Sequence, residues 1–254
     1  MKKITFTIAI LAVLVGLTTF GMAAPEPDPG KTMTSMSVAE LEKAADAARA
    51  QKDYQLAIDY FQAALRKEPK NAVLYNKMGM ARLKKGETSA ARADFQRASR
   101  LNPKFADALN NIGAVDYSEK RIGSAVKYFK KAVALDETRA TFHVNLGAAW
   151  FAQKKWDRSV LEYMRALEID PTVLETSSRT GVIAQMSTPE ERAEYSYMLA
   201  KIYARRGDIE SCLRCLRKAK EDGYRQFANV YKDEEFASVR LDARFSEVVA
   251  PVAK

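Results

Sequence analysis

The sequence has few of the residues on which metal-binding and disulfide-stabilised proteins depend. It contains one histidine and two cysteines in 254 residues, whereas a structural metal site or a disulfide framework needs several such side chains to converge. Glycine and proline are also scarce, at 11 and 8 residues, which excludes collagen and whole-chain low-complexity disorder. We therefore expect no metal site and no cofactor.

Signatures of catalysis are equally sparse. Cys212 and Cys215 form a C-x-x-C pair, but no strand precedes it, and two positions three apart within a helix are poorly placed for an unstrained disulfide. His143 has no second histidine to work with. Phosphate-binding, dinucleotide-binding, G-x-S-x-G and H-E-x-x-H motifs are missing from the sequence. We expect no enzyme and no catalytic residue; the competing interpretation is a redox protein that uses Cys212 and Cys215.

One long apolar run is present, and it lies at the N-terminus. Lys2 and Lys3 precede an uncharged, mainly apolar run from Ile4 to Phe20, and small residues follow up to Ala23. This order is typical of a secretory signal peptide, residues 1–23, with cleavage after Ala23. Its removal lowers the net charge from +9 to +7. The interpretation predicts export, to a bacterial periplasm; the alternative is an uncleaved helix that anchors the protein to the membrane.

The next residues differ in composition from both neighbours. Pro25, Pro27 and Pro29 lie close together, and no apolar period is present up to Met36. Such a segment is typical of an extended tether. We predict a disordered linker over residues 24–36.

A regular period runs through the middle of the chain. Small and aromatic residues recur at equal intervals, and a glycine set precedes them while a proline set follows. The aligned sets are Ala45, Gly79, Gly113 and Gly147; Ala57, Ala91, Ala125 and Ser159; Phe61, Phe95, Phe129 and Tyr163; Ala64, Ala98, Ala132 and Ala166; and Pro69, Pro103, Glu137 and Pro171. Agreement of several sets in one register indicates a repeat protein with a unit of about 34 residues.

This pattern resembles the tetratricopeptide repeat, in which glycine belongs to a first helix and alanine, an aromatic and alanine belong to a second. The resemblance implies an all-α fold: a right-handed superhelical solenoid of antiparallel helix pairs with a C-terminal helical cap. Four repeats are predicted over 37–71, 72–105, 106–139 and 140–171. The shared residues are those that pack the repeat, so they specify the fold and leave the function open.

The repeated residue types also have a physical reason. Ala125, Phe129 and Ala132 stand at i, i+4 and i+7, which places one large side chain between two small ones on a single helix face. Glycine at positions such as Gly113 lets helices approach closely without a Cβ. We therefore expect the aromatic of each second helix to fill the space beside the glycine.

The register breaks after Pro171 and returns later. We predict an insert over 172–188, a divergent fifth repeat over 189–223 that is displaced from the strict spacing, and a capping tail over 224–254. Thr188 and Pro189 are typical of a helix start. In the tail, four apolar residues are expected to cover the end of the stack: Phe236, Val239, Phe245 and Val248.

A solenoid of helix pairs presents its first helices on a concave groove, where we predict that a peptide or protein partner binds. Asparagine recurs there, and its amide can hold a peptide backbone while neighbouring apolar side chains contact those of the peptide. The groove candidates are Asn76, Lys77, Met80, Asn110, Asn111, Tyr117, Asn145 and Phe151. The alternative is that the amides satisfy local groups. Glu42 and Asp46 replace the Lys and Asn with which some family members hold chaperone C-termini, so that ligand is not expected.

The positive charge suggests a second surface. Arg97, Lys131, Arg165 and Lys218 share one position on the second helices and form a candidate basic ridge on the convex side. Such a ridge would make the protein an electrostatic adaptor for acidic envelope material or an anionic surface. The alternative is an ordinary solvated face. Aromatic residues are not interleaved with these charges, so nucleic acid is not an expected partner.

Overall fold

The computed structural model describes residues 32–174 and 188–250, and within these ranges the chain forms helices and turns without a β-strand. The predicted signal peptide, most of the predicted linker and residues 175–187 of the predicted insert lie outside the described residues. None of the helices that are described is long and apolar enough to cross a membrane.

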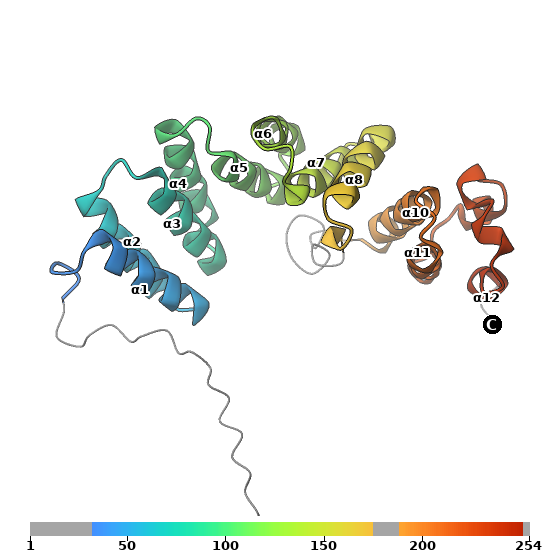
Figure 1. Ribbon diagram of the computed structural model, residues 1–254, viewed down its shortest axis with the longest axis horizontal. Helices are drawn as coiled ribbons and strands as arrows, with labels where there is room; N and C mark the ends of the chain where they lie inside the picture. Colours follow the sequence, from blue (N-terminus) through green and yellow to red (C-terminus); the bar gives the residue numbers. More distant parts are fainter. Residues whose placement is uncertain (1–31, 175–187, 251–254) are drawn as a thin grey trace, which may run out of the picture.

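The first eight helices form four consecutive pairs that follow one another along an open arch (Figure 1). The second helices begin at positions 54, 88, 122 and 156, which are equally spaced as the period predicts. The pairs are α1 (Val38–Ala50) with α2 (Tyr54–Lys67), α3 (Ala72–Lys85) with α4 (Thr88–Leu101), α5 (Ala106–Ser118) with α6 (Ile122–Leu135), and α7 (Ala140–Ala152) with α8 (Trp156–Ile169).

A fifth pair and a series of short helices complete the arch. The pair is α10 (Pro189–Arg205) with α11 (Ile209–Glu221), and the short elements are the 3₁₀ helices η2 (Phe227–Tyr231), η3 (Glu234–Phe236) and η4 (Val239–Leu241), followed by α12 (Phe245–Val249). The Thr188 hydroxyl accepts a hydrogen bond from the Glu191 amide at 3.1 Å, with Pro189 at the first helical position. The predicted start of this pair is confirmed.

The aligned sets form the core between helices. Phe61, Phe95, Phe129 and Tyr163 are fully buried, as are the small residues aligned with them. A Cβ placed on Gly113 would lie 2.6 Å from Cε1 of Phe129, and one on Gly79 would lie 2.7 Å from Cε1 of Phe95. These distances are shorter than van der Waals contact, so the expected packing of glycine against the aromatic ring is confirmed.

The turn inside each pair needs one residue with a left-handed backbone. In the second and fifth pairs this residue is glycine, at Gly86 and Gly207, whereas the other three pairs use lysine: Lys52 at φ 64°, Lys120 at φ 61° and Lys154 at φ 57°. A residue with a Cβ is strained in this conformation by about 1–2 kcal/mol. The tight turn is therefore imposed by the packing of the two helices and not by the turn residue itself.

The prediction of a disordered linker is wrong for residues 32–36, because these residues are ordered. Met36 is buried against the first helix pair, and Lys67 Nζ donates a hydrogen bond to the Thr34 carbonyl at 2.9 Å. Ser37 and Glu40 then form the predicted capping box at the start of α1. A buried methionine directly before the cap explains why the chain is fixed here.

The tail closes the C-terminal end of the array. Phe236, Val239, Phe245 and Val248 are all buried, as predicted for a cap. Lys220 Nζ donates to the Val248 carbonyl at 3.0 Å, and Arg240 Nη1 donates to the Val230 and Asp233 carbonyls at 3.1 and 3.0 Å. Cationic side chains thus hold the tail by its backbone.

Candidate functional site

Asparagine side chains connect neighbouring first helices. Asn111 on α5 donates from Nδ2 to Asn76 Oδ1 on α3, and Asn145 on α7 donates from Nδ2 to Asn110 Oδ1 on α5, each at 2.9 Å. Four of the predicted groove residues are therefore brought together as two pairs. Because an amide offers two N–H groups and an oxygen with two lone pairs, each pair retains hydrogen-bonding capacity after its internal bond. We call the surface formed by α1, α3, α5 and α7 around these amides the first-helix surface.

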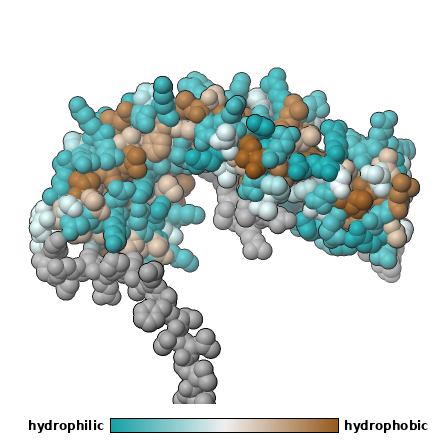
Figure 2. Space-filling view, in the orientation of Figure 1, coloured by the Kyte–Doolittle hydropathy of each residue, from teal (hydrophilic) through white to brown (hydrophobic). Residues whose placement is uncertain are grey.

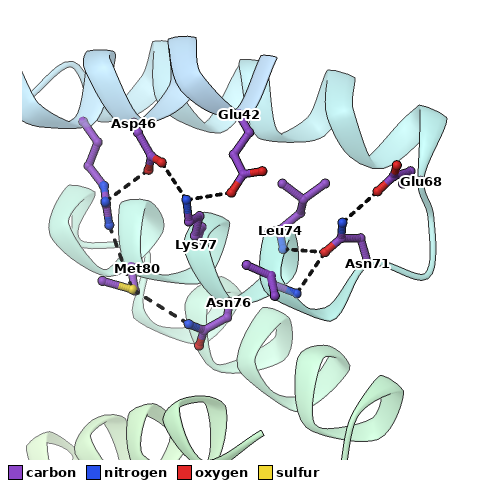
Figure 3. Close-up of polar contacts among 10 residues, drawn as sticks. Glu42, Asp46, Glu68, Asn71, Leu74, Asn76, Lys77 and Met80 are labelled. Carbon is purple, nitrogen blue, oxygen red and sulfur yellow. Dashed lines mark hydrogen bonds and ion pairs between the residues drawn. The ribbon is translucent and has the colours of Figure 1, made fainter. Parts of the chain in front are cut away.

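A cluster of charges lies at the N-terminal end of the first-helix surface (Figure 3). Lys77 Nζ lies 2.7 Å from Glu42 Oε1 and 2.6 Å from Asp46 Oδ2, and Arg49 Nη2 lies 3.1 Å from Asp46 Oδ1. Burial lowers the pKa of Lys77, but the bonds to Asp46 and Glu42 outweigh it and raise that pKa above its ordinary value. The charge of Lys77 is therefore matched within the protein, and this side chain is less available to a ligand than predicted.

Apolar contact on this surface comes from α3. Met80 is 38 % exposed and Val73 is 47 % exposed. The Met80 sulfur also accepts weak hydrogen bonds from Asn76 Nδ2 at 3.9 Å and from Arg49 Nη1 at 4.0 Å. Met80 thus joins the amides to the charged cluster, as Figure 3 shows, and it remains open to solvent as predicted.

Tyr117 and Phe151 are buried, so their predicted role in contacting a peptide is wrong. They are 6 % and 5 % exposed and belong to one apolar cluster with Tyr195 of α10. The Phe151 ring packs edge-on against Trp156 at 5.0 Å and against Tyr195 at 5.5 Å. The fifth helix pair thus supplies one of the two rings that pack on Phe151, and Tyr117 lies in the same apolar cluster.

The candidate basic ridge is exposed but partly neutralised. Arg165 pairs with Glu168 at 3.1 Å and Lys218 pairs with Asp222 at 3.7 Å. Arg97 and Lys131 instead lie over the rings of Tyr75 and Tyr128, each 5.9 Å from the ring centre. Helix α6 carries three lysines and no acidic residue. On α6 the positive charge is therefore not offset by an acidic residue of the same helix, whereas at Arg165 and Lys218 it is paired.

The cysteines and the histidine occupy packing positions. Cys212 and Cys215 are free thiols, and burial raises the pKa of each to about 12, so both stay protonated at neutral pH. His143 is buried, with Nδ1 2.7 Å from Glu162 Oε2 and Nε2 3.0 Å from the Glu137 carbonyl. Over the described residues, no group of three or more His, Cys, Asp or Glu side chains could hold a metal ion.

Sequence reasoning missed two features of this region of the molecule. The first is the pairing of the amides, which joins positions one residue further apart than the period and so crosses from one aligned set to the next. The second is a pocket beside α10 whose walls come from three separate segments. The described part of the visible face is mostly hydrophilic, with separate hydrophobic patches (Figure 2).

Comparison with known sequences and structures places the repeats in context. The sequence model of the tetratricopeptide repeat family matches residues 41–74, 76–140 and 117–173, and a second model of the same repeat matches residues 193–221. Comparison with curated proteins finds no significant match.

Solved structures agree on the fold. The MamA protein aligns with a TM-score of 0.52 and 17 % identity, covering 78 % of this chain and 95 % of that one. TTC0263, a thermophilic protein from Thermus thermophilus, aligns with a TM-score of 0.50 and 18 % identity over 81 % and 100 % of the two chains. YrrB, described as having an unusual peptide-binding site, aligns with a TM-score of 0.50 and 19 % identity over 77 % and 92 %. The predicted all-α solenoid of helix pairs is confirmed.

Proposed function

Because the chain belongs to the tetratricopeptide repeat family, we propose that it is a binding scaffold whose concave first-helix surface docks an extended segment of a partner protein, without catalysis. Proteins built from this repeat generally act by binding other proteins or peptides. YrrB, which shares the fold, is a peptide-binding protein by its own description.

The observation that supports this function best is the two hydrogen bonds between asparagine side chains of neighbouring first helices. In an extended peptide every residue except proline offers an N–H donor and a C=O acceptor. Asn111 and Asn145 each donate one N–H to a neighbouring asparagine and keep an oxygen and a second N–H. Asn76 and Asn110 hold these amides in position, so a peptide meets groups whose orientation is already fixed, which lowers the entropy cost of binding.

The proposal uses a smaller set of residues than the sequence predicted. Asn110, Asn111 and Asn145 contact the peptide backbone, while Met80 and Val73 contact its side chains. Asn76 acts by positioning Asn111. Tyr117 and Phe151 are excluded by burial and Lys77 by its ion pairs.

A peptide selected from a random display library against the protein tests this function. We expect Asn111→Ala with Asn145→Ala to weaken its affinity about tenfold or more, since two oriented hydrogen bonds are lost. The control is Gln62→Ala with Gln96→Ala, which removes two amides from the second helices α2 and α4. Equal affinity of the asparagine variant and the wild type, measured by calorimetry, would contradict the proposal.

The second candidate function is electrostatic adhesion through the basic ridge, favoured by the three exposed lysines of α6. Adhesion of this kind weakens steeply with salt, whereas docking by amides and apolar contacts changes little. Charge reversal at Arg97, Lys131 and Arg165 that abolishes binding, in a protein whose asparagine variant binds normally, would favour the ridge.

We also propose that the scaffold works outside the cytoplasm, as the N-terminal segment suggests. Expression of the full chain in a bacterium, fractionation and N-terminal sequencing test this. A periplasmic protein that begins at Ala24 supports cleavage and export. A membrane fraction that retains Met1 supports the anchored alternative, and a cytoplasmic protein contradicts both.

A further inference from the structure

A pocket of about 720 Å³ lies between α8, α10 and the segment that follows α11. Its volume is within the range that holds small ligands or single side chains of a peptide. Trp156 and Val160 of α8, Tyr197 of α10 and Tyr224 supply aromatic and apolar walls. Trp156 is 40 % exposed, although tryptophan has the largest apolar side chain and is highly buried on average.

One side of the pocket is fixed by internal bonds. Lys201 Nζ lies 2.9 Å from Asp233 Oδ2 and 3.4 Å from Glu235 Oε2, and Arg205 Nη2 lies 2.7 Å from Glu235 Oε1. The Tyr197 hydroxyl donates to Asp233 at 2.8 Å, and its ring stacks on Tyr224 with centres 4.3 Å apart. Both cations on this side are therefore matched by carboxylates, and the aromatic wall is held rigidly.

The other side of the pocket carries carboxylates without cations. Asp157, Glu190 and Glu194 are exposed, and within the described ranges none of them makes a hydrogen bond or an ion pair. Glu190 and Glu194 are four residues apart on α10, and like charges at this spacing repel and destabilise a helix. Arg225 is the remaining basic residue of the lining. The pocket thus has an excess of negative charge in a chain whose formal net charge is +9.

We infer that this pocket binds a peptide segment through an arginine or lysine side chain. The cationic head lies among Asp157, Glu190 and Glu194, and the aliphatic stem or guanidinium plane lies against Trp156 and Tyr224. An aromatic face and a carboxylate are together the usual surroundings of a bound guanidinium. The site is separate from the first-helix surface and does not depend on the function proposed for it.

Three blocked pentapeptides test the inference: acetyl-Leu-Arg-Leu-Arg-Leu-amide and its counterparts with glutamine or glutamate in place of arginine. Trp150→Phe leaves Trp156 as the single tryptophan, so its fluorescence reports occupancy of the pocket directly. We expect the arginine peptide to change this fluorescence and to bind at least tenfold more tightly than the glutamine peptide. Equal responses to the arginine and glutamate peptides, or no response to any of the three, would overturn the inference.

Removal of the charges supplies the second measurement. Asp157→Asn, Glu190→Gln and Glu194→Gln combined are expected to weaken binding of the arginine peptide about tenfold or more. The matched control is Glu137→Gln, Glu221→Gln and Glu247→Gln, which removes three exposed carboxylates outside the pocket. Asp157 and Glu190 lie in the first turns of their helices and stabilise them, so circular dichroism must show that both variants remain helical. Equal affinities of the two folded variants would overturn the inference.

Discussion

The apolar core is divided differently in the two halves of the helical array, although both halves repeat the same helix pair. One continuous apolar cluster extends from Tyr117 to Val249. Two smaller clusters lie N-terminal to it, of which one consists of Ala91, Phe95, Ile112 and Val115. A third small cluster, Leu109, Ala132 and Phe142, joins α5, α6 and α7. Two ion pairs with buried carboxylates also lie in this part of the array, Arg82 with Asp94 and Arg92 with Asp116.

A single set of aligned positions accounts for much of this difference. At the place where the repeat commonly has tyrosine, the C-terminal half has Trp150 and Tyr203, whereas the first three pairs have Ala48, Arg82 and Asp116. Arg82 pairs with Asp94 at 2.8 Å. One position of the repeat can therefore be filled by an aromatic ring or by a buried charge without altering the fold, but the charge requires partners from neighbouring helices.

Asp116 has the most complete set of such partners. Its side chain is fully buried and accepts hydrogen bonds from Arg92 at 2.8 Å, Arg121 at 2.6 Å and Ser124 at 2.6 Å. Burial raises the pKa of Asp116, but the bonds from Arg92, Ser124 and Arg121 outweigh it and hold that pKa below its ordinary value. The carboxylate connects α4, α5 and α6, so the second and third helix pairs meet through charge as well as through the apolar cluster of Ala91, Phe95, Ile112 and Val115.

The largest effect is expected from Asp116→Asn, which breaks this connection. We expect a loss of about 2–3 kcal/mol in the free energy of unfolding at pH 7, because charged hydrogen bonds are replaced by weaker ones and one amide N–H group faces donors. Urea unfolding followed by circular dichroism measures the loss.

The pH dependence of this loss in stability tests whether it comes from the charge of Asp116. A lowered pKa in the folded state contributes stability above the unfolded pKa, and this stability disappears as the pH falls. The difference between wild type and Asp116→Asn should therefore be complete above about pH 5 and shrink below about pH 4. Asp107→Asn, on the same helix but partly exposed, is the control. A difference that does not vary with pH would contradict the role of the charge.

Substitution of the aligned glycines by alanine is expected to have an intermediate effect on stability, and the effect should differ between the two halves. A Cβ on Gly113 meets Phe129 at 2.6 Å, whereas one on Gly147 meets Tyr163 at 3.2 Å. Alanine gains about 1 kcal/mol in helix propensity, and overpacking costs about 1–3 kcal/mol. We expect Gly113→Ala to destabilise by about 1–2 kcal/mol and Gly147→Ala to be close to neutral in thermal unfolding.

Gly123→Ala is the control for this pair, because a Cβ there meets nothing within 4 Å. It should stabilise α6 by up to about 1 kcal/mol. If Gly113→Ala stabilised the protein as much as Gly123→Ala, the close approach to Phe129 would not be a constraint on the fold.

The smallest effect concerns the turns, which are alike in both halves. Lys120→Gly removes the strain of a left-handed backbone but increases the freedom of the unfolded chain, so we expect a net gain of about 0.5 kcal/mol. Lys127→Gly, in the middle of α6, should instead cost about 1 kcal/mol. The midpoint temperature of thermal unfolding should therefore rise for Lys120→Gly and fall for Lys127→Gly. A shift in the same direction for both variants would contradict backbone strain at Lys120.

The sequence predicted those contacts whose residues recur at the same position in every repeat. Phe129 and Gly113 each belong to a set that recurs once per repeat, and their contact followed from that spacing. The burial of Tyr117 and Phe151 did not follow, because the apolar cluster to which they belong includes residues such as Tyr195 that come after the break in register. Lys77 was placed correctly on a first helix, but its ion pairs come from α1, and a period does not reveal which charges meet.

The way in which the tail is held has a consequence for behaviour in acid. Lys220 and Arg240 bind main-chain carbonyl oxygens, which do not take up protons in the range where carboxylates do. Acidification therefore leaves these two attachments of the tail intact, while it weakens the carboxylate bonds of Asp116 and those that join Asp233 and Glu235 to Lys201 and Arg205. In acid, the main-chain bonds and the buried apolar residues of the tail are expected to keep covering the end of the array after its charged contacts have weakened.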